Sequence, residues 1–294
     1  MRLLLRLCLI AVPLVAALPL LAAESETYQL RYRYKKGDVL TWNVEQTLRI
    51  TTSVKGKTET VETSSRSTKI WTVIDIADDG TATFEYKVGD VNMKRSQTDM
   101  EDEKYDSRVD KEIPPAFQPL EGTIGVPLAE LSIDPLGERK KKRVLTAYRG
   151  ASEENRIAIP LPKDPIAVGK NWLMDTPIDI QLPDQTVKKI TADQQFTLDG
   201  VKNDIAAIRF KTRIKTPIDD PKLLSQIIDK HASGSVKLDL DAGHLISQET
   251  TINERVIGFE GTGSWIHHQL HFKECCCGLK SCELCGKEKI EVRR

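Results

Sequence analysis

The sequence lacks the short motifs by which the common enzyme classes are recognised. It has no Gly-x-Ser-x-Gly turn for a nucleophilic serine, no zinc-binding His-Glu-x-x-His and no Gly-x4-Gly-Lys-Ser/Thr loop for a nucleotide phosphate. The glycines of Gly258–Gly263 lack the strand and helix that a nucleotide site requires, so a bulge or strand crossing explains them better. The acidic residues between Asp99 and Glu112 do not have the spacing of a calcium-binding EF-hand loop. We therefore expect a protein that is not an enzyme, with an unrecognised hydrolase as an alternative.

The sequence also lacks an excess of either charge. Its 43 Lys and Arg residues balance its 43 Asp and Glu residues, so no overall positive charge draws the chain to nucleic acid. Aromatic residues make up only 5% of the chain, and aliphatic side chains must therefore fill most of the core. Apart from the first residues, no stretch is long and apolar enough to be considered as a membrane-spanning helix.

The first 23 residues have the layout of a secretory signal peptide. Arg2 and Arg6 precede the uncharged run Leu7–Ala23, which ends in small residues. The alternative is an uncleaved membrane anchor, but Pro13 and Pro19 interrupt the run, which is also slightly short for a spanning helix. We expect cleavage after residue 23, export to the periplasm or the extracellular space, and a mature chain that does not span a membrane.

Most of the remaining chain alternates between apolar and polar residues, which is the pattern of strands with one buried side. After Gly37, the period of two is carried by Leu40, Trp42, Val44, Leu48 and Ile50, and Gln46 is the exception. Tight turns are expected at Asp78–Gly80, Asp199–Gly200 and Asp241–Gly243, because glycine readily adopts the positive φ that such turns need. These features predict a mainly β fold with antiparallel sheets.

The arrangement of the sheets is left open, because a curved half-barrel and a sandwich in two halves produce the same alternation. We expect an N-terminal half over residues 24–145, a C-terminal half over 146–272 and a Cys-rich tail over 273–294. One or two short helices should interrupt the strands, and Pro221–His231 is the clearest, because its apolar residues have helical spacing.

Several short segments resemble a family of uncharacterised exported bacterial β-rich proteins, a domain of unknown function. The similar segments are Tyr34–Asp38, Asp78–Ala82, Leu161–Trp172 and Asp241–Leu245, and the resemblance covers roughly residues 27–258. It implies an envelope location and a two-part β architecture. It implies no reaction, since that family has no assigned activity.

The final segment is the one place where candidate ligands gather. Cys282-Glu-Leu-Cys285-Gly has the form of a zinc knuckle, and Cys277 with Cys275 or His271 would complete four ligands for zinc or copper. Exported cysteines normally form disulfides, however, and a reactive or dimerising thiol is a third possibility, because five mature cysteines cannot all pair within one chain. No cofactor is expected apart from this possible zinc ion.

A basic run, Arg139–Arg143, is the other feature that stands out. Its charges are suited to the head groups of anionic lipids, although such a run is more often a solvated loop. Together, the alternating sheet and the amphipathic segment Leu223–Ile228 favour a non-catalytic envelope domain that presents one face to a lipid or a protein partner. Metal binding by the tail is the main alternative.

Overall fold

The computed structural model describes residues 26–146, 157–182 and 185–277, and more than half of these residues lie in strands. The predicted signal peptide at residues 1–23 lies outside the described residues. The strands are β1 Thr27–Tyr28, β2 Val39–Val54, β3 Lys57–Ile76, β4 Ala82–Gln97, β5 Glu103–Asp106, β6 Pro127–Ile133, β7 Arg139–Val144, β8 Ile166–Ala167, β9 Asn171–Asp175, β10 Ile178–Gln181, β11 Val187–Ile190, β12 Ala192–Lys202, β13 Ile205–Ile214, β14 Ser233–Asp239, β15 His244–Ile257 and β16 Trp265–Cys277.

Helices are few and short, as predicted. The helix expected near Pro221 is present as α1 (Pro221–Gln226), followed by the 3-10 turn η2 (Ile228–Lys230). The Asp220 carboxylate caps α1 by accepting a 2.8 Å hydrogen bond from the backbone N–H of Lys222, and Pro221 occupies the first turn, where its missing N–H is harmless. A further 3-10 helix, η1, spans Pro115–Leu120.

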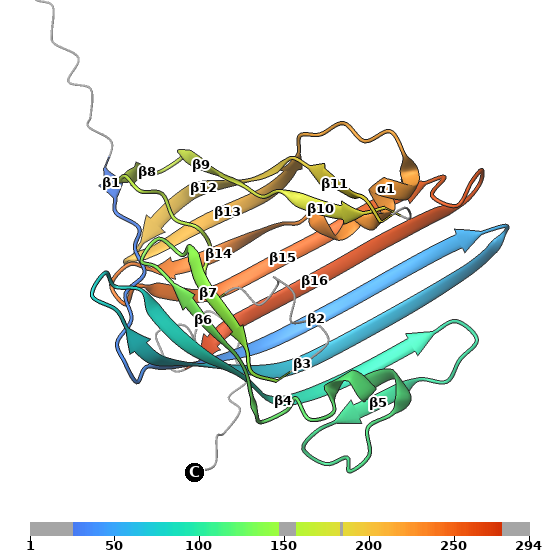
Figure 1. Ribbon diagram of the computed structural model, residues 1–294, viewed down its shortest axis with the longest axis horizontal. Helices are drawn as coiled ribbons and strands as arrows, with labels where there is room; N and C mark the ends of the chain where they lie inside the picture. The colour runs from blue at the N-terminus through green and yellow to red at the C-terminus, as the bar shows by residue number, and fades with distance from the viewer. Residues whose placement is uncertain (1–25, 147–156, 183–184, 278–294) are drawn as a thin grey trace, which may run out of the picture.

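A single 12-stranded antiparallel sheet carries the fold, in the order β7-β6-β4-β3-β2-β16-β15-β14-β13-β12-β9, with β5 paired to β4. Two small sheets, β1-β8 and β10-β11, lie beside it. Figure 1 shows the large sheet strongly curved, with its edge strands β7 and β9 unpaired with each other. Of the two predicted arrangements, the curved half-barrel is therefore confirmed. The centre of the sheet joins the predicted halves, because β2 pairs with β16 along its length.

The curvature encloses the main core at one end of the sheet. We call the face that carries Trp42 the inner face. Phe84 from one arm of the sheet and Phe196 from the other belong to the same buried cluster, although six strands separate β4 from β12 in the sheet order. Side chains on one face of distant strands meet only when the sheet bends around that face. The inner face is thus the concave one.

The segment between β1 and β2 closes this end by linking the two arms. The Tyr32 N–H donates to the Pro135 carbonyl at 2.9 Å, and the neighbouring Arg33 N–H donates to the Gly243 carbonyl at 2.8 Å. The Tyr32 hydroxyl donates a hydrogen bond to the Ile159 carbonyl at 3.1 Å, and it accepts one from the Ile159 N–H at 2.9 Å. Burial raises the pKa of the Tyr32 hydroxyl well above its ordinary value. We call this covered region the closed end.

Two of the three predicted turns are where the sequence places them. Gly80 and Gly243 both have positive φ, of 82° and 72°, between paired strands. The turn predicted at Asp199–Gly200 is wrong, because these residues form a bulge inside β12. The chain reverses instead at Asn203–Asp204, whose φ angles of 52° and 60° are those of a two-residue hairpin turn.

Candidate functional site

The inner face changes character along β16, β2 and β3, away from the closed end. In this part the inward side chains are half-buried rather than buried, and they mix aliphatic, aromatic and small hydroxyl groups with one amide and one imidazole. We call this region the open stripe. It consists of Gln46, Leu48, Ile50 and Thr52 of β2, Val61, Thr63, Ser65 and Ser67 of β3, and Ile266, His268, Leu270 and Phe272 of β16.

Strand register brings the apolar members of the open stripe together. Leu48 lies opposite Leu270, and Ile50 lies opposite Val61. Gln46, the exception in the sequence pattern, lies opposite Phe272, so it keeps its place on the inner face. With about 3.3 Å per residue and about 4.8 Å between strands, the stripe is about 20 Å long and about 10 Å wide.

Alongside the open stripe, the outer face of the same strands is polar or charged. Its side chains include Glu45, Thr47 and Arg49 of β2, Glu62 and Arg66 of β3, and His267, Gln269 and His271 of β16. An antiparallel sheet with one solvated face shows this contrast. In this part of the sheet, apolar side chains are therefore confined to the inner face.

The rest of the inner face beside the open stripe is covered. On one flank, Leu223 and Ile227 pack with Ile190 of β11 in a second cluster, and α1 and η2 contact β15. On the other flank, Phe117 of η1 packs against Val91 and Tyr105 of β4 and β5 in a third cluster. Figure 1 shows α1, β10 and β11 at the upper right and β5 at the lower right, with β16, β2 and β3 running between them.

A buried ion pair marks the junction between the closed end and the open stripe. Lys69 Nζ lies 3.0 Å from Glu274 Oε2, and the two side chains are only 11% and 7% exposed. The Lys69 ammonium also lies 5.0 Å from the centre of the Phe272 ring, within the range of a cation–π interaction. The junction is therefore polar but carries no net charge.

Two polar atoms at this junction have no hydrogen-bond partner. They are the indole Nε1 of Trp42, a residue that is 3% exposed, and the amide Oε1 of Gln248. Trp42 lies opposite Lys69 on β3, and Gln248 lies opposite Glu274 on β16. Most buried polar groups in folded proteins are hydrogen-bonded, so two such atoms beside one ion pair are unusual.

The predicted metal ligands lie on the outer face as far as they are described. His271, Cys275 and Cys277 follow one another along β16, and the Nε2 of His271 lies 3.0 Å from Glu249 Oε1. Four extended residues place His271 about 13 Å from Cys275, which is too far for both to bind one ion without a change in the strand. Cys275 is disulfide-bonded.

Cys282 and Cys285 lie outside the described residues, so metal binding by the tail stays a prediction. In the part of the chain that the structure describes, no three His, Cys, Asp or Glu side chains are grouped as a metal site.

The basic run Arg139–Arg143 forms the exposed edge strand β7 and not the loop that was expected. Charged residues are typical of edge strands, because they discourage pairing with the edge of another sheet. Members of the run are engaged locally: Lys140 contacts Asp134 and Glu138 at 3.1 and 2.7 Å, and Arg143 contacts Glu130 at 3.2 Å.

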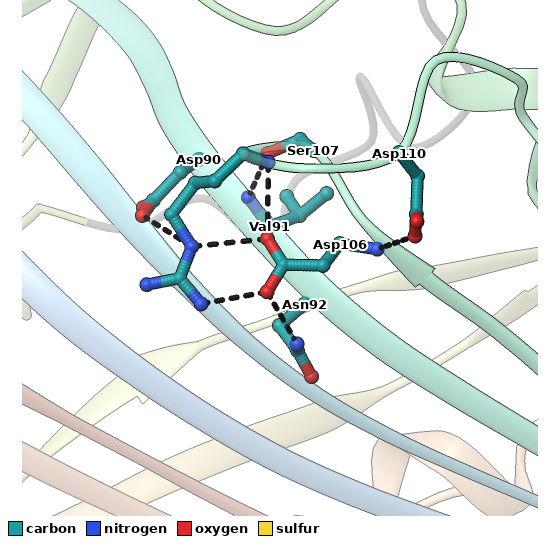
Figure 2. A network of polar contacts seen from close by, with 7 residues as sticks. Asp90, Val91, Asn92, Asp106, Ser107 and Asp110 are labelled. Carbon is teal, nitrogen blue, oxygen red and sulfur yellow. Dashed lines mark hydrogen bonds and ion pairs between the residues drawn. The ribbon is translucent and has the colours of Figure 1, made fainter.

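The acidic stretch after Asp99 forms β5 and a turn that is held by its own charges. The Asp106 carboxylate accepts hydrogen bonds from Arg108 at 2.7 to 3.0 Å and from the Asn92 amide at 2.9 Å. Figure 2 shows Asp106 between Asn92 and the turn that carries Ser107 and Asp110. The Arg108 guanidinium holds the pKa of the Asp106 carboxyl well below its usual range. This network braces the flank of the open stripe and offers no unpaired group to a ligand.

A shallow cleft of about 420 Å³ lies at the β9 edge of the sheet, lined by Pro160–Ile166 and by Asn171–Met174. Its aromatic member, Trp172, donates its indole N–H to the Pro160 carbonyl at 2.9 Å. This indole is already satisfied, unlike that of Trp42. The open stripe and its junction are therefore the better candidate site.

No family model matches the chain, and no curated protein matches it. Among solved structures, one of lipid–protein interactions in lipovitellin is 10% identical, with a TM-score of 0.45 over 85% of this chain. This chain spans about a quarter of that one, 26%. DynF from dynemicin biosynthesis in Micromonospora chersina is 6% identical, with a TM-score of 0.22 over 86% of each chain.

A DUF1329 family protein from Desulfovibrio piger is 11% identical, with a TM-score of 0.16, and the match covers 84% of this chain and 89% of that one. These likenesses are too distant to assign a family, and the resemblance noted in the sequence stays a prediction. Within the described residues, no helix is long and apolar enough to cross a membrane.

Proposed function

We propose that the protein is an exported, non-catalytic binding domain that holds the acyl chain of a lipid on the open stripe. The observation that carries this proposal is the set of half-buried apolar side chains, such as Leu48, Ile50 and Leu270, on a concave face whose flanks are covered. Export is supported by the signal-like residues 1–23.

The dimensions of the open stripe favour an acyl chain over a protein partner. A stripe about 20 Å long exceeds one leaflet of a bilayer, which is about 15 Å of hydrocarbon, or half of the full core. Its area of about 200 Å² is far below the roughly 800 Å² that each partner buries in a typical protein–protein interface. One extended chain therefore fills the stripe, whereas a protein would need much more surface.

The test is a titration with a fluorescent acyl probe. Leu270→Glu places a carboxylate among the apolar side chains of the open stripe, and we expect binding at least roughly tenfold weaker, because an unpaired charge resists removal from water. Gln269→Glu is the matched control, since it adds the same charge one residue away on the outer face of β16. It should leave the affinity unchanged.

Chain length supplies a second readout. Each methylene removed from water contributes about 0.8 kcal/mol, so affinity should rise by up to roughly fourfold per methylene until the stripe is filled. Equal weakening by both variants, or an affinity that does not depend on chain length, would contradict an acyl site on this face.

A further inference from the structure

We infer that the junction at Lys69 and Glu274 is the head-group site of this lipid, and that it selects an uncharged, hydroxyl-bearing head such as a glycerol monoester. The inference rests on the proposed function and adds the chemical class of the ligand. Its basis is the two unpartnered polar atoms, Trp42 Nε1 and Gln248 Oε1, beside an ion pair that is already neutralised.

The position of the junction matches the polar end of a bound lipid. Along β16, the inward side chains are Phe272 of the open stripe, then Glu274, and then Cys276 in the core of the closed end. An acyl chain that lies on the open stripe with one end toward the closed end would bring that end to the ion pair. The opposite end of the stripe offers no comparable set of buried polar groups among the described residues.

The orphaned atoms define which head group fits. Trp42 Nε1 is a donor only, and the Gln248 amide oxygen is an acceptor only. The Gln248 amide nitrogen contacts Thr250 Oγ1 at 3.4 Å, which leaves the oxygen as the free end of the side chain. A hydroxyl group donates one hydrogen bond and accepts others, so a hydroxyl-bearing head can satisfy both atoms.

The charge balance excludes a strongly charged head. The Lys69 ammonium is matched by the Glu274 carboxylate at 3.0 Å, and the pair is buried from water. A carboxylate or phosphate head would bring an additional unpaired charge into this site, at a large cost in free energy. A neutral head adds hydrogen bonds without adding charge.

The experiment compares lipids that share one acyl chain and differ in the head: a glycerol monoester, the free fatty acid at neutral pH, and an alkane-tailed probe with no polar head. The wild-type protein should bind the glycerol monoester roughly tenfold more tightly than the fatty acid. Trp42→Phe keeps a buried ring but removes the N–H, and it should remove most of the advantage of the monoester over the headless probe.

Glu274→Gln is the more decisive variant. Glutamine has nearly the same shape as glutamate but no charge, so the Lys69 ammonium loses its charged partner. The preference should then reverse, with the fatty acid bound roughly tenfold more tightly than the glycerol monoester. Thermal unfolding checks that each variant is folded. If Glu274→Gln does not fold, the wild-type ranking and the Trp42→Phe variant still decide the matter.

The outcomes separate this inference from the proposed function. Binding of all three lipids with equal affinity would overturn the head-group site while leaving the acyl site in place. Tighter wild-type binding of the fatty acid would overturn the choice of a neutral head. Failure of all three to bind would overturn the proposed function itself.

Discussion

The closed end and the open stripe share strands β2, β3 and β16, yet one is a core and the other is a surface. On β2, Trp42 is buried, whereas Leu48 and Ile50 on the same face are half-buried. The difference lies in what covers them, since Tyr32 and Ile159 reach across the closed end and no described element crosses the open stripe. Apolar side chains thus become a core or a binding surface according to whether another segment of the chain lies over them.

The largest expected difference between the two regions is in stability. Phe84 is fully buried in the closed end, and Phe84→Ala should lower the free energy of unfolding by about 3–5 kcal/mol. Phe272 is half-buried in the open stripe, and Phe272→Ala should cost only about 1 kcal/mol, because much of its surface is already in water. Urea denaturation measures both, and equal losses would show that the open stripe is as much a core as the closed end.

A second comparison tests the segment that closes one end. Gly243 has φ of +72°, and a Cβ there would lie 2.6 Å from the Arg33 Cβ and 2.8 Å from the Arg33 backbone nitrogen. Gly243→Ala should destabilise the protein by about 2–3 kcal/mol, from backbone strain plus the clash. Gly37→Ala, also at positive φ but with open space around it, should show the strain alone. Identical losses, measured by thermal unfolding, would mean that the contact with Arg33 is not part of the closure.

The sequence predicted which side chains share a face of each strand, but not which segments of the chain lie over that face. The alternation in β2 assigns Leu40 and Leu48 to one face, and the register confirms this assignment even for Gln46. Cover depends on contacts between distant residues, such as the hydrogen bond from Arg33 to Gly243 and the ion pair from Lys69 to Glu274, 205 residues apart. The alternation of residues within one strand does not predict such contacts between distant residues.

Two local predictions failed for identifiable reasons. Five consecutive basic residues are typical of a solvated loop, but an edge strand needs few apolar residues, so β7 shows no alternation. Asp199–Gly200 was interpreted as a turn, but Gly in a strand also permits a bulge, and Asn203–Asp204 tolerate positive φ almost as well. The short helix at Pro221 was predictable because its cap and its apolar spacing are both local.

The response to pH should also separate the two regions. Burial lowers the pKa of His244 at the closed end, so the folded protein binds this proton less readily than the unfolded chain. Stability should therefore fall as the pH drops below about 6.5, the ordinary pKa of histidine. His244→Gln should flatten this decline, measured by urea denaturation between about pH 7 and pH 5. An unchanged slope would exclude His244 as its source.

The smallest expected effect concerns the flank of the open stripe. The pKa of Asp106 is lowered by Arg108, so its carboxylate contributes stability that is present above about pH 4 and is lost as the pH falls further toward the folded pKa. Asp106→Asn should lower the unfolding midpoint slightly at neutral pH and have no effect in strong acid, as followed by circular dichroism. Weaker acyl binding by this variant would show that the flank also shapes the stripe.

Photo-crosslinking with a glycerol monoester that carries a photoreactive group in the middle of its acyl chain locates the bound chain on the protein. Peptide mass spectrometry of the labelled protein should place the label on Leu48–Thr52 of β2 and Ile266–Phe272 of β16, with loss of labelling in Leu270→Glu but not in Gln269→Glu. Labelling of the β9 edge near Leu173, or labelling that Leu270→Glu leaves unchanged, would contradict an acyl site on the open stripe.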